Sequence, residues 1–199
     1  ILMASQITIN PSQAALIHQT EDPPQNGFYY VGWTIYGNGV YRSYFQFDLS
    51  SIGDTIASAN FELDLIGQNG NVTGDTFDIH KITSSWNAST LNWGSQPSFL
   101  LDVAASINGS VIQANYPSII SWDITNLANE WQNTPSQNFG FVIEADDSYG
   151  FPYFQAPRLE LVSSPVPEPA TIALLGIGLA GLAGAELRRR RKKRAVVRG

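Results

Sequence analysis

Apolar and polar residues alternate with a period of two along much of the first 164 residues. The clearest apolar positions are Phe45, Phe47 and Leu49; Ala59, Phe61, Leu63 and Leu65; Phe139, Phe141, Ile143 and Ala145; and Leu159 and Leu161. Successive side chains of a strand point to opposite faces, so each set predicts a strand with one buried face. Segments rich in Gly, Asn and Pro, such as 23–27, 37–39 and 67–71, predict turns between strands. The pattern predicts an all-β, two-sheet sandwich of the jelly-roll type.

A helical spacing occurs in one stretch of this region, residues 123–132. Ile124, Leu127, Ala128 and Trp131 would share one face of a helix there. Asp123 or Thr125 can serve as the N-cap, and the pattern ends before Pro135. We therefore expect one short helix within the sandwich.

The last 35 residues, 165–199, differ sharply from the rest. Pro167, Glu168 and Pro169 come first, and an 18-residue, mainly apolar run at 170–187 follows. As a helix this run would span about 27 Å, close to the ~30 Å core of a bilayer. A basic cluster comes next: Arg188, Arg189, Arg190, Arg191, Lys192, Lys193 and Arg194. Cationic flanks stay in the cytoplasm, so we expect a single transmembrane helix with residues 1–164 outside. The predicted domains are 1–164 and 165–199.

This tail resembles the PEP-CTERM sorting signal of Gram-negative bacteria, through its Pro-Glu-Pro element, Gly/Ala/Leu span and terminal Arg/Lys cluster. The resemblance implies export, transient anchoring in the inner membrane through residues 170–187, and processing by an exosortase-type enzyme near Pro167. It implies a final location at the cell surface or outside the cell, often with a role in exopolysaccharide and biofilm. An ordinary C-terminal anchor without processing is the alternative.

The sandwich region resembles the DNRLRE domain group, which includes disaggregatase-related and alginate-type carbohydrate-binding modules. Six segments and Trp131 carry the resemblance: 42–52 (RSYFQFDLSSI), 56–63 (IASANFEL), 85–97 (SWNASTLNWGSQP), 122–125 (WDIT), 138–141 (NFGF) and 157–161 (PRLEL). It implies a β-sandwich that binds carbohydrate. Residues before Arg42 match the group poorly.

The charge is unevenly distributed. Residues 1–164 contain three basic and 15 acidic residues, a formal charge of −12, whereas the tail carries +6. Such a body repels nucleic acids, so we expect no nucleic-acid partner. It also disfavours anionic glycans unless calcium bridges them. The chain has no cysteine, and the G-x-G-x-x-G match at 176–181 lacks the strand that a dinucleotide site requires.

Two aromatic segments are the candidate ligand-binding elements. One holds Tyr29, Tyr30, Trp33 and Tyr36, and the other holds Tyr149, Phe151, Tyr153 and Phe154. Flat aromatic faces can stack on sugar rings. We predict Trp33, Tyr36, Tyr149 and Tyr153 as ligand-binding residues, with burial in the core as the alternative. For Trp86, Trp93, Trp122 and Trp131 we favour the core.

No catalytic residue can be assigned. His18 and His80 are far apart in the sequence, and we expect both on the surface. Carboxylates in loops suit a structural calcium ion, for which Asp146, Asp147 and Asp75 are the candidate ligands; no cofactor is otherwise predicted. The leading hypothesis is an exported, non-catalytic module that binds polysaccharide or integrates into an exopolysaccharide matrix. An adhesive or structural surface protein without a sugar site is the first alternative, and a glycan lyase is the second.

Overall fold

The structure, a computed structural model, describes residues 4–20, 27–34, 39–114, 118–145 and 150–164. By its contacts the chain divides into two units, Ile1–Pro165 and Val166–Gly199. The predicted sorting motif, apolar span and basic cluster lie outside the described residues. Among the described residues, no helix is long and apolar enough to cross a bilayer.

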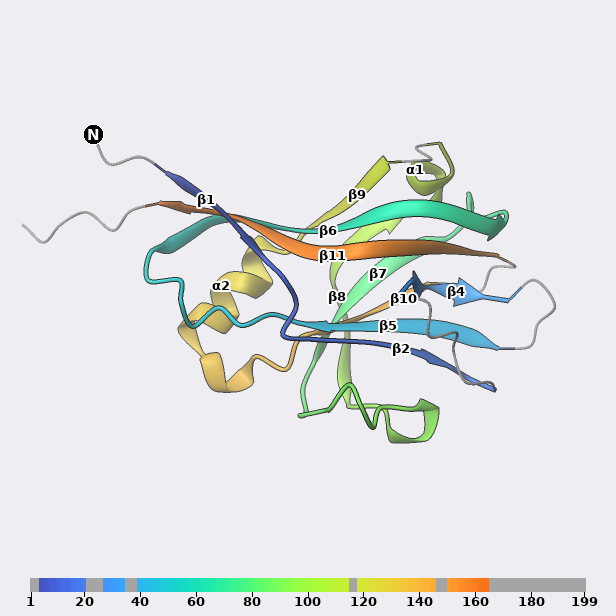
Figure 1. Cartoon of the computed structure of the whole chain (residues 1–199), viewed down its shortest axis with the longest axis horizontal. Coiled ribbons are helices and arrows are strands. Elements are labelled where there is room, and N and C mark those ends of the chain that lie inside the picture. The colour runs from blue at the N-terminus through green and yellow to red at the C-terminus, as the bar shows by residue number, and fades with distance from the viewer. Residues whose placement is uncertain (1–3, 21–26, 35–38, 115–117, 146–149, 165–199) are drawn as a thin grey trace, which may run out of the picture. The chain divides into compact units, whose positions relative to one another are not determined.

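Within the described part, two antiparallel sheets form the first unit (Figure 1). The first sheet has the order β1-β11-β6-β9, and β3 also pairs with β11. Its strands are β1 (Ser5–Ile9), β3 (Tyr29–Tyr30), β6 (Thr55–Gly70), β9 (Ser118–Asp123) and β11 (Gly150–Ser164). The second sheet has the order β2-β5-β10-β7-β8, and β4 also pairs with β5. Its strands are β2 (Gln13–His18), β4 (Gly32–Trp33), β5 (Val40–Gln46), β7 (Thr76–Ile82), β8 (Phe99–Asn108) and β10 (Phe141–Ala145). The predicted all-β sandwich is confirmed.

The core lies between the sheets and is centred on aromatic rings. Phe61 of β6 contacts Phe45 of β5 and Phe141 of β10, each at a ring-centroid distance of 4.9 Å. Trp122 of β9 lies 5.8 Å from Phe61 and donates its indole N–H to the Phe77 carbonyl. The alternating positions predicted to face inward on β5, β6 and β11 are buried here, because they come from facing sides of the two sheets.

The predicted helix is present as α2 (Thr125–Asn133), and it buries Leu127, Ala128 and Trp131. The predicted N-cap is wrong, because the cap position is Ile124, which makes no side-chain cap bond. Asp123 lies one residue earlier, and its Oδ1 accepts from the backbone N–H and the hydroxyl of Thr125.

Three short helices add to the prediction: α1 (Gly109–Ala114) and the 3-10 turns η1 (Trp93–Ser95) and η2 (Pro135–Gln137). Each is too short to show a helical period in the sequence.

Two strand predictions need correction. Residues 67–71 were expected to form a turn, but β6 continues to Gly70 and pairs with the start of β11. Phe139 was expected to point inward with Phe141, but it packs on the outer face of the second sheet. Gly140 separates them with φ of +81°, a left-handed conformation that breaks the alternation.

A second apolar cluster covers the outer face of the second sheet. Tyr44, whose side chain points away from that of its neighbour Phe45, is fully buried there with Ile17, Ile82 and Val142. Trp86 and Trp93, both partly exposed, pack over this cluster from the segment between β7 and β8. The core prediction therefore holds fully for Trp122 and Trp131, whereas Trp86 and Trp93 cover a separate cluster.

Candidate functional site

Five partly exposed aromatic side chains meet where β3, β5 and β11 come together; we call them the aromatic end cluster. They are Phe28, Tyr30, Tyr41, Phe151 and Tyr153. Tyr30 lies 5.1 Å from Tyr41, 5.6 Å from Phe151 and 6.0 Å from Tyr153, measured between ring centroids. Tyr41 lies 5.2 Å from Phe151, and Phe28 lies 6.3 Å from Tyr153. The two aromatic segments seen in the sequence thus contribute to one site.

The pairing of β3 with β11 determines which aromatic residues are available. Tyr30 is the register partner of Tyr153, and Tyr29 is the partner of Phe154. Phe154 is fully buried, and Tyr29 contacts the core ring of Phe45 at 4.9 Å. A register shift between Tyr153 and Phe154 breaks the strand alternation at this point, and Tyr30 and Tyr153 remain partly exposed. Burial raises the pKa of Tyr29 above its ordinary value.

Two glycines allow neighbouring strands and side chains to approach closely at the aromatic end cluster. Tyr153 lies over Gly67, its partner on β6, and a Cβ at position 67 would lie 2.3 Å from the tyrosine oxygen. A Cβ at Gly32 of β4 would lie 2.5 Å from the Gly150 carbonyl oxygen. A side chain at position 67 would displace the Tyr153 ring, and one at position 32 would push against the β11 backbone next to Phe151.

Uncharged polar groups border the rings. The exposed Asn69 of β6 is the register partner of Phe151 and therefore lies on the same face. The Ser43 hydroxyl donates to the Tyr30 carbonyl at 2.9 Å, which ties β3 to β5. A ring platform with an adjacent amide is suited to an apolar sugar face and its hydroxyls.

A pocket of about 430 Å³ lies between the end of β5 and α2. Its lining includes Gln13, Gln46, Trp131 and Asn138. Its amides already have partners within the protein: Gln13 donates to the Gln46 side chain, and Asn138 donates to the Phe47 backbone carbonyl. These amides therefore serve to connect strands, and the aromatic end cluster is the better candidate for a ligand.

Residues 30–157 match the model of carbohydrate-binding module family 96. The chain belongs to this family. The match includes Tyr30, Tyr41, Phe151 and Tyr153, so the family 96 module contains four members of the aromatic end cluster. Residues 165–191 match the PEP-CTERM protein-sorting motif, which confirms the resemblance of the tail to that sorting signal. The narrower DNRLRE name stays a prediction. No curated protein matches the chain.

The predicted ligand-binding residues have different outcomes. Tyr153 lies in the aromatic end cluster, whereas Trp33 lies on β4, where it is partly exposed and pairs with Val40. Tyr36 and Tyr149 lie outside the described residues. Sequence reasoning missed Tyr41, although extending the alternation of Phe45 and Phe47 backward along β5 places position 41 on the same face. A role in binding stays a prediction for all four predicted residues.

Both histidines of the chain, His18 and His80, were expected on the surface, and this is wrong. His18 is 4% exposed and His80 is 8% exposed. The His18 ring lies 4.3 Å from that of Tyr41, beneath the aromatic end cluster, and its Nδ1 accepts from the Thr20 backbone N–H. Nδ1 of His80 lies 3.1 Å from the Leu100 carbonyl oxygen. Both lie on strands where a neighbouring segment covers them, which strand alternation alone does not reveal.

The calcium prediction is untested. Asp75 is buried in the turn before β7, where the Gly109 N–H donates to its carbonyl. Asp146 and Asp147 lie outside the described residues. Among the residues that the structure describes, no three His, Asp or Glu side chains gather as a metal site would require.

Proposed function

We propose that this chain is an exported protein that binds polysaccharide through the aromatic end cluster of its family 96 module. The observation that carries the proposal is the meeting of Tyr30, Tyr41, Phe151 and Tyr153 at one accessible place within the matched region. Family 96 consists of binding modules, not catalytic ones. Stacking of a pyranose on these rings would supply apolar contact, and Asn69 would add a hydrogen bond.

The PEP-CTERM tail supports export of the protein across the inner membrane. We propose that residues 170–187 anchor it transiently in the inner membrane and that an exosortase-type enzyme cleaves near Pro167. The released module would then bind exopolysaccharide at the cell surface or in a biofilm. The mass of the mature protein from its native host tests this step, since an intact C-terminus would refute cleavage.

Binding is tested with the full chain in mild detergent, by affinity electrophoresis through gels that contain polysaccharides. Tyr153→Ala and Tyr30→Ala should weaken binding about ten-fold or more, as expected when an aromatic contact residue is truncated. Leu101→Ala is the matched control, because this residue is 86% exposed and lies on β8, which carries no member of the cluster. Circular dichroism confirms that each variant is folded.

Two outcomes would favour the alternatives. Retention of binding in both tyrosine variants would refute the site, and absence of binding to any glycan would favour an adhesive or structural protein. Depolymerisation of a polysaccharide by the purified chain would favour a lyase.

A further inference from the structure

We propose that the polysaccharide bound at the aromatic end cluster is neutral, an inference that rests on the proposed function. The cations of residues 1–164 are all paired with protein carboxylates. Anionic glycans such as polyuronates or sulfated chains are normally held by Lys and Arg side chains that can approach their charged groups. The sequence provides three such side chains here, Arg42, Lys81 and Arg158, and the structure describes all of them.

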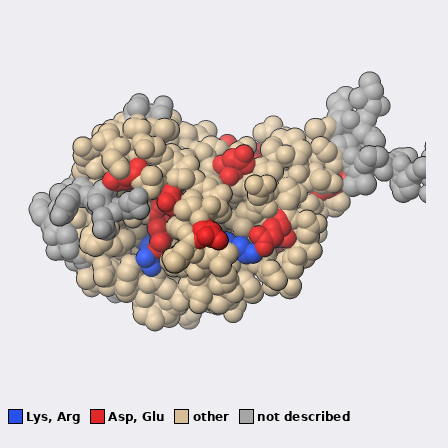
Figure 2. All heavy atoms as spheres, turned by 180° about the vertical axis from the view of Figure 1, so that it is seen from behind, with Lys and Arg blue, Asp and Glu red and all other residues tan. Residues whose placement is uncertain are grey.

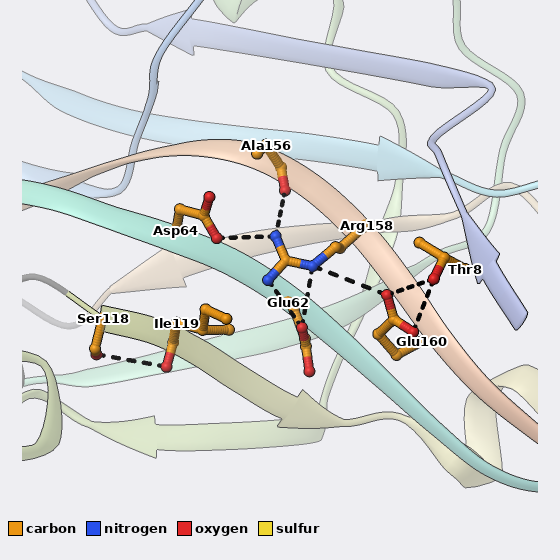
Figure 3. A network of polar contacts seen from close by, with 8 residues as sticks. All are labelled: Thr8, Glu62, Asp64, Ser118, Ile119, Ala156, Arg158 and Glu160. Carbon is orange, nitrogen blue, oxygen red and sulfur yellow. Dashed lines mark hydrogen bonds and ion pairs between the residues drawn. The ribbon is translucent and has the colours of Figure 1, made fainter. Parts of the chain in front are cut away.

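Arg158 is surrounded by carboxylates on the outer face of the first sheet (Figure 3). Its guanidinium contacts Glu62 at 3.0 Å and Asp64 at 2.8 Å, and Glu160 lies 3.9 Å away. Burial lowers the pKa of Arg158, but these carboxylates outweigh that effect and raise it. Three acids around one cation leave this face negative.

Arg42 is held equally firmly on the outer face of the second sheet. It forms an ion pair with Glu144 and donates to the Gln96 side chain at 2.6 Å. Its guanidinium also lies 4.8 Å from the ring centroid of Trp93 and 5.6 Å from that of Phe99. Only 23% of the Arg42 side chain is exposed, because its guanidinium is paired with Glu144 and also lies against the Trp93 ring.

Lys81 forms an ion pair with Glu130 of α2, and 14% of its side chain is exposed. In Figure 2, the blue patches at the centre of the face lie directly against red ones. A glycan carboxylate or sulfate would have to displace a protein carboxylate from one of these pairs. It would also approach a body with a formal charge of −12.

The groups beside the rings are uncharged where the structure describes them. Asn69 and Gln68 are the partners of Phe151 and Pro152, and Gly67 lies beneath Tyr153. His18 is buried under Tyr41. Rings, amides and hydroxyls suit a chain of neutral hexoses, whose hydroxyls donate and accept without charge.

The test compares matched neutral, uronate and sulfated polysaccharides, each with the full chain, in EDTA and in excess calcium. We expect the neutral polymer to bind at least about ten-fold more tightly than the anionic ones, and its affinity to change less than about two-fold between low and high salt. Asn69→Lys places a free cation beside Phe151 and should increase uronate affinity in a salt-dependent manner. Asn69→Gln is the control and should not.

Tighter binding of a uronate or sulfated polymer than of the neutral one, in EDTA or in calcium, would overturn the inference. If Tyr153→Ala abolished that anionic binding, the proposed site would stand and only the ligand class would be wrong. Neutral-glycan binding that survives Tyr153→Ala and Tyr30→Ala would instead overturn the proposed site. Absence of binding to every polymer would overturn both.

Discussion

Gly32 provides a sharp test of how the aromatic end cluster is positioned. It lies on β4 with φ of +116°, and an added Cβ would lie 2.5 Å from the Gly150 carbonyl oxygen. Gly32→Ala therefore combines a strained backbone with a clash against backbone atoms of β11. Because Phe151 follows Gly150 directly, the clash should move a ring of the cluster as well.

The magnitude follows from these two effects. A non-glycine residue in a sparsely populated backbone region costs about 1–3 kcal/mol. Relief of the contact requires β4 or β11 to shift by roughly 1 Å, and overpacking of this kind costs about 1–3 kcal/mol more. We expect Gly32→Ala to lower the free energy of unfolding by about 2–6 kcal/mol, a large part of the stability of a small domain.

Urea denaturation, followed by tryptophan fluorescence, measures this change, and two variants serve as controls. Gly27→Ala has a positive φ of +76° but no atom within 4 Å of the new Cβ, so it should lose only about 1 kcal/mol. Gly53→Ala has neither problem and should change stability by less than about 1 kcal/mol. If Gly32→Ala unfolded at the same urea concentration as Gly53→Ala, the described contact between β4 and β11 would be wrong.

Other predictions concern single side chains. Arg158→Gln leaves the carboxylates around it without a cation and should cost about 1–2 kcal/mol in urea denaturation, less at high salt; unchanged stability would contradict the network. Burial raises the pKa of Tyr44 above that of a tyrosine in the unfolded chain. The stability that the neutral Tyr44 side chain contributes is therefore fully present below about pH 10, and it is lost above that pH because the unfolded state ionises first. Tyr44→Phe should therefore flatten the fall in stability between about pH 10 and 11.5, and an unchanged slope would argue against burial. Asp123→Ala removes two hydrogen bonds to Thr125 and should cost about 0.5–1 kcal/mol at pH 7. Those bonds lower the pKa of Asp123, so the deficit should shrink as pH falls below about 4, and a deficit independent of pH would refute this explanation.

Period-two alternation was enough to predict the sandwich, because inward-facing residues such as Phe45, Phe61 and Leu161 are buried between the sheets. It failed where a residue's environment depends on distant chain segments. Tyr44 is buried because the segment containing Trp86 folds over the outer face of its sheet. Strand alternation does not encode such a covering segment.

The candidate site was partly predictable for the same reason. The sequence marks two aromatic segments, and the register between β3 and β11 then decides that Tyr30 and Tyr153 meet while Tyr29 and Phe154 enter the core. That register depends on pairing between residues more than 120 positions apart, which local patterns do not specify. Tyr41 joins them through the second sheet, which requires knowledge of how the sheets face each other.

Strand β11 also has a mechanical consequence. It begins beside Phe151 and Tyr153 and ends at Ser164, immediately before the segment that matches the sorting motif. Fifteen residues of extended chain span roughly 50 Å, so one strand would carry tension between a glycan held at its first residues and an attachment beyond its last. Hydrogen bonds to β1, β3 and β6 run across this strand, so any share of the pull that acts on these neighbouring strands loads the bonds in shear rather than opening them one after another. The module would therefore resist a pull between a bound glycan and its C-terminal attachment far better than its unfolding energy alone suggests.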